Sequence, residues 1–307
     1  MQAKIVPQKR HRYRGEIPLH MMMIPGMIAL IVFAYIPMVG LMIAFQKFNP
    51  AKGLFGGNPF IGLDNFRFIF AMPGIWRIIC NTLYISIMKI IFGTLVPIVV
   101  ALMLNECRNA MFKRTIQTTI YFPYFLSWII LSGVLLDVLS PSSGIINKII
   151  LALGGQGIYF LGDNKWFPFT LILSDVWKNF GFSSIVYLAA ITSIDMALYE
   201  AASIDGAGRW RQTKHITLPG MRMIIVLLMV LNLGNLFNAG FEQIFNLYTP
   251  QVYESGDVID TLIYRVGLQQ AQFGPSAAIG LVKACVSMIL ISFSYYFAWK
   301  HFDYQIF

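Results

Sequence analysis

Long apolar runs alternate with short polar segments along the chain, and the length of these runs sets the first expectation. Six runs reach the roughly 20 apolar residues that an α-helix needs to cross a bilayer; they lie approximately at residues 20–45, 78–104, 115–139, 167–192, 221–246 and 276–299. We therefore predict an all-α, polytopic membrane protein. A basic cytoplasmic tail at residues 1–19 would precede one domain of six transmembrane helices at residues 20–307.

The composition supports a membrane protein and the distribution of charge predicts its orientation. The chain is 57% hydrophobic and only 12% charged, whereas soluble domains carry about 25% charged residues. With the amino terminus inside, the predicted inner segments hold 13 Lys and Arg residues and the outer segments hold 7. Because cationic loops are retained on the cytoplasmic side, we expect both termini in the cytoplasm. These cytoplasmic loops account for the net charge of +9, so we expect no nucleic-acid partner.

The segment between the fourth and fifth apolar runs has a distinctive pattern. It reads Glu200-Ala201-Ala202, then Gly206, then Ile216-Thr217-Leu218-Pro219. The alanines favour a helix with a smooth surface, and the glycine permits a turn that ends this helix. Pro219 would bias Leu218 towards an extended conformation and open the next membrane helix.

This pattern resembles the EAA signature of inner-membrane permease subunits of binding-protein-dependent ABC importers. Other segments, spread over essentially the whole chain, resemble the branch of that family that imports complex oligosaccharides: Tyr35-Ile36-Pro37-Met38, residues 44–50, Gly62-Leu63-Asp64-Asn65-Phe66, Asn81-Thr82-Leu83, Leu104-Asn105-Glu106 and Val266-Gly267-Leu268-Gln269-Gln270. The resemblance implies that residues 199–220 contain a cytoplasmic coupling helix that docks onto an ATPase. The residues expected to carry this contact are Glu200, Ala201, Ala202, Asp205, Gly206, Gly208, Leu218 and Pro219.

The resemblance also implies a set of partners. These are a second, related permease, two nucleotide-binding ATPase subunits, an extracytoplasmic solute-binding protein, an oligosaccharide and the lipid of a bacterial cytoplasmic membrane. The chain has no Gly-x-x-x-x-Gly-Lys-Ser/Thr phosphate-binding loop, so ATP and Mg²⁺ would belong to the partner subunits. We expect no catalytic residue, metal or cofactor in this chain, since its three cysteines lack ligand spacing and its four histidines lie at or outside the ends of the spans.

Polar residues within the fourth and fifth spans are the candidates for a substrate pathway. If the fifth span is one continuous helix, its polar residues share a face roughly 140° wide. We expect this face to point to partner helices or water. Hydrogen bonds between helices are the competing explanation for these polar residues, and Trp177 is equally consistent with an interface anchor. The predicted pathway residues are Trp177, Asn179, Asn235, Asn238, Glu242, Gln243 and Asn246.

Three lysines, Lys89, Lys178 and Lys283, fall inside predicted spans, where each charge needs a partner or water. Asp175 and Lys178 have the spacing of a pair on one helix. Asp137 and Glu242 are further candidate partners for the lysines, and the sequence leaves the pairing open.

Two other classes of protein remain alternatives on this evidence. An ion-coupled secondary transporter would use Asp137, Asp175 or Glu242 as its coupling carboxylate. An intramembrane enzyme is disfavoured, because no histidine and no acidic pair at metal-ligand spacing lies inside a span.

Overall fold

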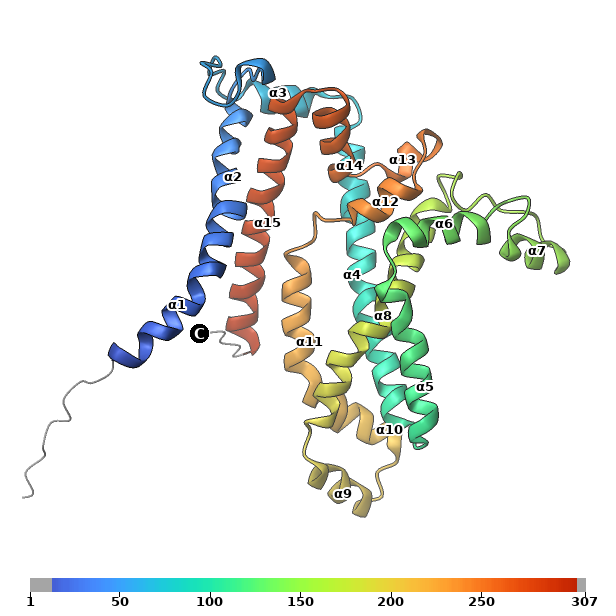
Figure 1. The fold of residues 1–307 in the computed structure, drawn as a ribbon. Helices are drawn as coiled ribbons and strands as arrows, with labels where there is room; N and C mark the ends of the chain where they lie inside the picture. Colours follow the sequence, from blue (N-terminus) through green and yellow to red (C-terminus); the bar gives the residue numbers. More distant parts are fainter. Residues whose placement is uncertain (1–12, 303–307) are drawn as a thin grey trace, which may run out of the picture.

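The computed structural model describes residues 13–302, and this part of the chain is almost entirely helical (Figure 1). Four helices are long and apolar enough to cross a membrane: Pro18–Phe45, Ile75–Glu106, Arg209–Leu233 and Phe273–Phe297. Two bent helix pairs bring the candidate spans to as many as six: Ala110–Phe125 with Trp128–Val138, and Phe167–Thr192 with Met196–Ile204. The described chain is therefore an all-α polytopic fold. The basic residues of the predicted tail before Tyr13 lie outside the described residues.

The first span is one rod made of several helical forms. α1 (Tyr13–Leu30) continues through a π-helical turn (Ile31–Tyr35), α2 (Ile36–Met38) and a 3-10 segment (Val39–Phe45). Pro37 follows the π turn. Because proline lacks an amide hydrogen, it removes one hydrogen bond from a helix interior, and the wider turn accommodates that loss without breaking the rod.

Three long helices form the centre of the molecule. α4 (Ile75–Glu106) packs along α8 (Phe167–Thr192), and α11 (Leu218–Leu233) contacts both. α15 (Phe273–Phe302) packs against α11 and against the 3-10 end of the first span. Buried apolar residues join α4, α8 and α11 at one end, including Ala101, Tyr187 and Met221.

The two ends of the bundle carry different short elements. At one end α9 (Met196–Ile204) and α10 (Arg209–Gln212) project beyond the long helices, and α5 (Ala110–Tyr121) begins nearby (Figure 1). At the opposite end lie α3 (Asp64–Ala71), α6 (Trp128–Val138), α7 (Ile145–Ala152), α12 (Phe241–Leu247), α13 (Tyr253–Gly256) and α14 (Ile259–Tyr264) (Figure 1).

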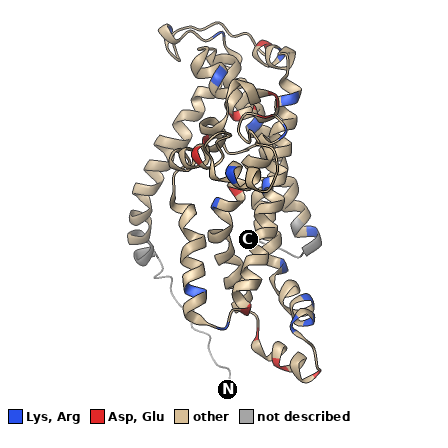
Figure 2. Ribbon diagram, turned by 90° about the vertical axis from the view of Figure 1, so that its right-hand side faces the viewer, with Lys and Arg blue, Asp and Glu red and all other residues tan. Residues whose placement is uncertain are grey.

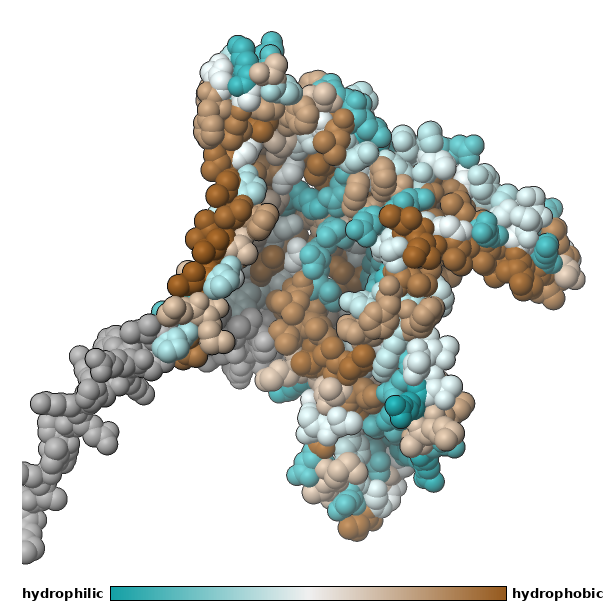
Figure 3. Space-filling model, in the orientation of Figure 1, coloured by the Kyte–Doolittle hydropathy of each residue, from teal (hydrophilic) through white to brown (hydrophobic). Residues whose placement is uncertain are grey.

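The surface agrees with a molecule that is embedded in lipid over its middle. Figure 3 shows hydrophobic side chains along the rod of α1 and α2 and hydrophilic ones at the two ends of the molecule. Figure 2 shows long uncharged stretches of helix between the charged positions. Phe33 in the first span is 81% exposed. Exposing such an apolar side chain costs free energy in water but not in lipid.

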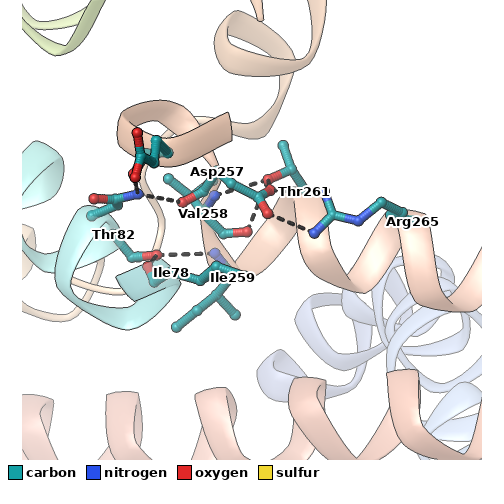
Figure 4. Close-up of polar contacts among 9 residues, drawn as sticks. Ile78, Thr82, Asp257, Val258, Ile259, Thr261 and Arg265 are labelled. Atoms are coloured by element: carbon teal, nitrogen blue, oxygen red, sulfur yellow. Dashed lines mark hydrogen bonds and ion pairs between the residues drawn. The ribbon is translucent and has the colours of Figure 1, made fainter. Parts of the chain in front are cut away.

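The elements opposite α9 are fixed by a polar network around Asp257 (Figure 4). The buried Asp257 carboxylate accepts hydrogen bonds from Thr261 and, over 3.1 and 2.5 Å, from both terminal nitrogens of Arg265. Thr82 of α4 accepts a hydrogen bond from the backbone amide of Ile259 at 2.9 Å. The hydrogen bonds to Asp257 raise the pKa of the Arg265 guanidinium, against the opposite effect of burial. Segments of the chain far apart in sequence are thereby joined to α4.

Two predicted spans differ from the structure. The third, expected as one helix at 115–139, bends by 104° between Phe125 and Trp128, because Pro123 interrupts the hydrogen-bond ladder and Ser127 begins a new helix by accepting a bond from the amide of Ile130. The fifth, expected at 221–246, ends as a helix at Leu233, and a non-helical segment from 234 to 240 separates it from α12. Gly240 has φ +92°, a conformation that glycine adopts readily.

The start of the fifth span also differs from the prediction. Leu218 is helical, with φ −62° and ψ −45°, so the expected extended conformation before Pro219 is wrong. The helix begins at Arg209 and runs to Leu233 as one candidate span. A π-helical turn at Thr213–Thr217 precedes Pro219, just as another precedes Pro37. In both places the wider turn tolerates the loss of the hydrogen bond that proline cannot donate.

Close packing of α8 against α5 predicts the first experimental result. Gly181 is buried, and a Cβ atom at this position would overlap the carbonyl oxygen of Ile120. We expect Gly181→Leu to destabilise the detergent-solubilised protein by about 1–3 kcal/mol, because the two helices must separate, and to lower its thermal unfolding temperature. Gly133→Leu is the control, since Gly133 has open space around it. Equal unfolding temperatures for both variants would contradict the packing described.

Candidate functional site

A polar cavity of about 290 Å³ lies where α4, α8, α11 and the break in the fifth span meet. This volume is at the lower end of the range of small-molecule sites. Its lining is unusual for the interior of a membrane bundle, because it includes several amides, two hydroxyls and one ion pair. The lining residues are Ser86, Lys89, Ile90, Gly93, Asp175, Asn179, Ser183, Asn232, Asn235, Asn238, Ala239 and Gly240. The Ser86 hydroxyl is buried and has no hydrogen-bond partner in the structure.

The break in the fifth span creates much of this lining. Backbone turns run from the Asn235 amide to the Asn232 carbonyl at 2.9 Å and from the Asn238 amide to the Asn235 carbonyl at 2.8 Å. The side chains of Asn235 and Asn238 belong to exposed residues that line the cavity. The short turns of the break therefore carry the asparagines that line this wall of the cavity.

The ion pair of the cavity joins Lys89 on α4 with Asp175 on α8. Their charged atoms are 3.5 Å apart, and the side chains are only 10% and 23% exposed. The prediction that Asp175 could pair with Lys178 on the same helix is therefore wrong. Lys178 instead donates to the carbonyl oxygen of Tyr124 at 2.8 Å and lies over the rings of Tyr124 and Trp128.

The third intramembrane lysine also has a partner. Lys283 on α15 forms an ion pair with Asp260 on α14, and neither Asp137 nor Glu242 is that partner. Sequence spacing could not identify this contact, because the two residues come from separate helices that only the fold brings together.

The structure brings some of the predicted pathway residues together and separates others. Asn179, Asn235 and Asn238 line the cavity. Trp177 faces a separate, apolar hollow together with Leu135, Phe160 and Phe169. The predicted shared face of the fifth span does not exist, because Glu242, Gln243 and Asn246 belong to α12 beyond the break.

Each of the three α12 residues has its own environment. Gln243 is completely buried and is held by Leu171 and Ser174 of α8. Glu242 is exposed, and Asn246 donates to the carbonyl of Glu242 at 2.7 Å. Among the lining residues that sequence reasoning did not select are Ser86 of α4 and Ser183 of α8, because a single hydroxyl in an apolar span is also explained by a hydrogen bond to the backbone of its own helix.

The α9 segment is a short helix held at both ends. Asp195 caps its start by accepting a hydrogen bond from the Ala197 amide at 2.9 Å. Gly206, with φ +74°, turns the chain after Ile204, and the Ala207 amide returns to the Ala202 carbonyl at 2.8 Å. The helix lies at 68° to α8.

Side-chain contacts tie α9 and α10 to the long helices. The hydroxyls of Tyr199 and Thr217 are 2.9 Å apart, which connects α9 to the start of α11. Arg209 forms a 3.0 Å ion pair with Glu106 at the end of α4. α9 is therefore connected to the start of α11 and along the chain to α8, and α10 is connected to the end of α4.

The surface of this segment is exposed and partly apolar. Glu200, Ala201, Asp205, Gly206, Gly208 and Pro219 are exposed, while Ala202 and Leu218 are half-buried. Ile204 and Trp210 are 87% and 78% exposed. Trp210 was not selected from the sequence, and its exposure marks it as part of the same surface.

Comparison with known proteins agrees with this arrangement. Residues 93–303 match the family described as binding-protein-dependent transport system inner membrane component. The polygalacturonan/rhamnogalacturonan transport system permease protein YteP of Bacillus subtilis is 42% identical over 273 residues, covering 89% of this chain and 85% of YteP. Protein LplB of the same organism is 39% identical, covering 94% and 90%.

Solved structures show the same fold. A chain in the crystal structure of a bacterial ABC transporter involved in the import of the acidic polysaccharide alginate superposes with a TM-score of 0.87. It is 39% identical, and the match covers 94% of this chain and 97% of that one. A chain of the alginate transporter in complex with its alginate pentasaccharide-bound periplasmic protein gives a TM-score of 0.85.

A helical bundle with a polar cavity at a broken span and a projecting helix at one end defines a membrane transport permease. The chain belongs to the family of inner-membrane components of binding-protein-dependent transport systems. It is thus a multi-pass permease subunit of an ABC importer of the bacterial inner membrane, and ATP is hydrolysed by partner subunits. This family membership decides against the two alternatives, an ion-coupled secondary transporter and an intramembrane enzyme.

The bend in the third span provides a test of how its exposed backbone is stabilised. We expect Lys178→Met to lower the free energy of unfolding by about 1–3 kcal/mol, because the Tyr124 carbonyl loses a charged hydrogen-bond donor inside the bundle. Thermal unfolding in detergent measures the change. Lys165→Met is the matched control, since Lys165 is exposed. If the two variants unfold at the same temperature, Lys178 does not stabilise the bend.

Proposed function

We propose that this permease moves an oligosaccharide with uronate residues through the cavity beside the broken fifth span, by alternating access. The observation that carries this proposal is the amide-rich lining of that cavity. Amide groups both donate and accept hydrogen bonds, which suits a ligand with many hydroxyls, and their N–H groups suit a sugar carboxylate. Asn179, Asn232, Asn235 and Asn238 are the residues assigned to this contact.

The proposed class of cargo also draws on the relatives. YteP is named for polygalacturonan and rhamnogalacturonan, and the alginate transporter for an acidic polysaccharide. These polymers contain uronic acids. At about 40% identity over most of the chain, a cargo of the same chemical class is the simplest assignment, while the length of the oligosaccharide is left open.

The proposed assembly contains a second, related permease, two ATPase subunits that bind ATP and Mg²⁺, and an extracytoplasmic solute-binding protein. In this assembly α9 lies in the cytoplasm and both termini are on the same side. α12, α13 and α14 would then face the solute-binding protein, and the apolar surface of the spans would face lipid.

The coupling mechanism follows from the connections of α9. Closure of the ATPase dimer would push on the surface formed by Glu200, Ala201, Ala202, Asp205, Gly206, Gly208, Leu218 and Pro219. Because Arg209–Leu233 is one continuous helix, it would carry this motion directly to the break at 234–240, which forms a wall of the cavity. Rigid-body motion of packed helices is a common form of such transitions.

Reconstitution of the complete importer in proteoliposomes tests the proposed cargo. With the cognate solute-binding protein present, oligogalacturonides or alginate oligosaccharides should stimulate ATP hydrolysis and enter the vesicles, whereas neutral maltooligosaccharides of equal length should do neither. Stimulation by the neutral sugars alone would overturn the uronate assignment.

Substitutions in the coupling surface should separate ATP hydrolysis from transport. We expect Glu200→Lys and Gly206→Leu to reduce uptake by about tenfold or more while the protein still inserts into the membrane, because the first reverses a contact charge and the second strains a left-handed turn. Uptake and ATPase activity measured on the same vesicles check this. Lys148→Glu, an exposed charge reversal on α7, should leave both activities unchanged. Normal uptake in both coupling variants would count against the proposal.

Substitutions in the cavity should weaken cargo recognition. Asn235→Leu and Asn238→Leu each remove one hydrogen-bonding amide, which is worth about 1 kcal/mol, and so should lower the rate of uptake at limiting cargo about fivefold. Asn246→Leu is the matched control because Asn246 bonds within its own helix, outside the cavity. An equal loss in all three variants would show that the cavity wall has no special role.

A further inference from the structure

Polar contacts cross the part of the cavity farther from α9. α4 and α8 both run towards the α9 end, and on them Gly93, Asn179 and Ser183 line the cavity one or two turns closer to that end than Lys89 and Asp175 do. Ser86, one turn before Lys89 on α4, also lines the cavity. On the fifth span, Ala239 and Gly240 lie past the asparagines in the direction of α12. Lys89, Asp175 and the end of the break therefore meet in the outer part of the cavity.

Lys89 has three polar neighbours from the protein. It donates to the Ala239 carbonyl at 2.7 Å and to the Gln243 side-chain oxygen, and it forms an ion pair with Asp175. An ammonium group has three donors and no acceptor. In this arrangement Lys89 therefore links α4 to α8, to the break and to α12.

Gln243 connects the same site to α8. Its side-chain nitrogen donates to the Leu171 carbonyl and to the Ser174 hydroxyl, both at 2.8 Å, and the residue is fully buried. The break in the fifth span is consequently tied to α4 through Lys89 and to α8 through Gln243. Asp175 supplies the opposite charge that a buried lysine requires.

Gly240 permits this close approach. It has φ +92°, and a Cβ atom there would come within 3.0 Å of the Lys89 ammonium nitrogen. The left-handed conformation favours glycine at this point, and a side chain there would require the Lys89 ammonium group to shift.

We propose that Lys89, Asp175 and Gln243 form a latch that holds the outer side of the cavity closed. Moving the segment at 234–240 away from α4 and α8 requires the contacts at Ala239 and Gln243 to separate, and this separation admits cargo from the outer side. Lys89 is a positioning residue in this mechanism. The inference rests on the proposed function in taking this cavity as the transport route and in placing α9 in the cytoplasm.

Accessibility of Asn238 to a reagent outside the cell tests the latch. Cys80, Cys107 and Cys285 are first replaced by serine, and Asn238→Cys is labelled in intact cells with a membrane-impermeant maleimide. Lys89→Met with Asp175→Asn opens the latch without leaving a buried charge unpaired, and Gln243→Leu opens it while keeping the ion pair. Both should increase the labelling rate about tenfold, within the range typical of coupled sites.

ATP hydrolysis by the purified importer gives a second readout. If the latch restrains the closed state, both variants should hydrolyse ATP faster than the parent when the solute-binding protein is absent. Lys283→Met with Asp260→Asn is the matched control, because it removes another part-buried ion pair between helices that does not touch the cavity. This control should change neither the labelling rate nor the basal ATPase rate.

A purely structural role predicts a different outcome. Both latch variants would then unfold at a lower temperature while Asn238→Cys kept the labelling rate of the parent, and this result would overturn the latch. Labelling requires no cargo. A failure here therefore leaves the uronate assignment standing, and a failure of the cargo test leaves the latch standing.

Discussion

The structure depends on the need to satisfy backbone polar groups wherever a span is broken inside the bundle. In hydrocarbon no water replaces a lost helical hydrogen bond, so irregular backbone persists only where protein or a watery cavity surrounds it. At two of the interruptions in the described spans, a lysine from another helix donates to the exposed backbone. Lys178 donates to Tyr124 at the bend of the third span, and Lys89 donates to Ala239 at the break of the fifth.

This constraint explains why charged residues occur at membrane depth in a protein that performs no covalent chemistry. A buried lysine is costly by itself, and its placement becomes favourable when it replaces missing backbone partners and meets an acidic group. Lys89 has Asp175 for this purpose. Lys178 relies instead on the faces of Tyr124 and Trp128, a cation–π arrangement that is stronger when desolvated. The two lysines thus stabilise the irregular backbone at these two interruptions.

Much of the architecture was predictable from the sequence, whereas the centre of the candidate site was not. Apolar run length correctly indicated an all-α membrane protein, and the spacing from Glu200 to Pro219 indicated the family. Hydropathy reports composition and not backbone geometry, so it extended the fifth helix through Asn235 and Asn238 and assigned Gln243 to the same face. Pairing Asp175 with Lys178 followed helical spacing, but a residue from α4 was the actual partner, and only tertiary packing determines that choice.

The position of the break also bears on the coupling proposed for α9. A straight fifth span would move as a unit, and a push at its inner end would have to displace all of its packing at once. Here the continuous helix ends at Leu233, and short backbone turns and Lys89 hold the segment that follows it. The two prolines that could have weakened the rods, Pro37 and Pro219, are each preceded by a π turn that preserves continuity. The helix from Arg209 is therefore continuous up to the cavity, and the departure from helical geometry is confined to the cavity wall.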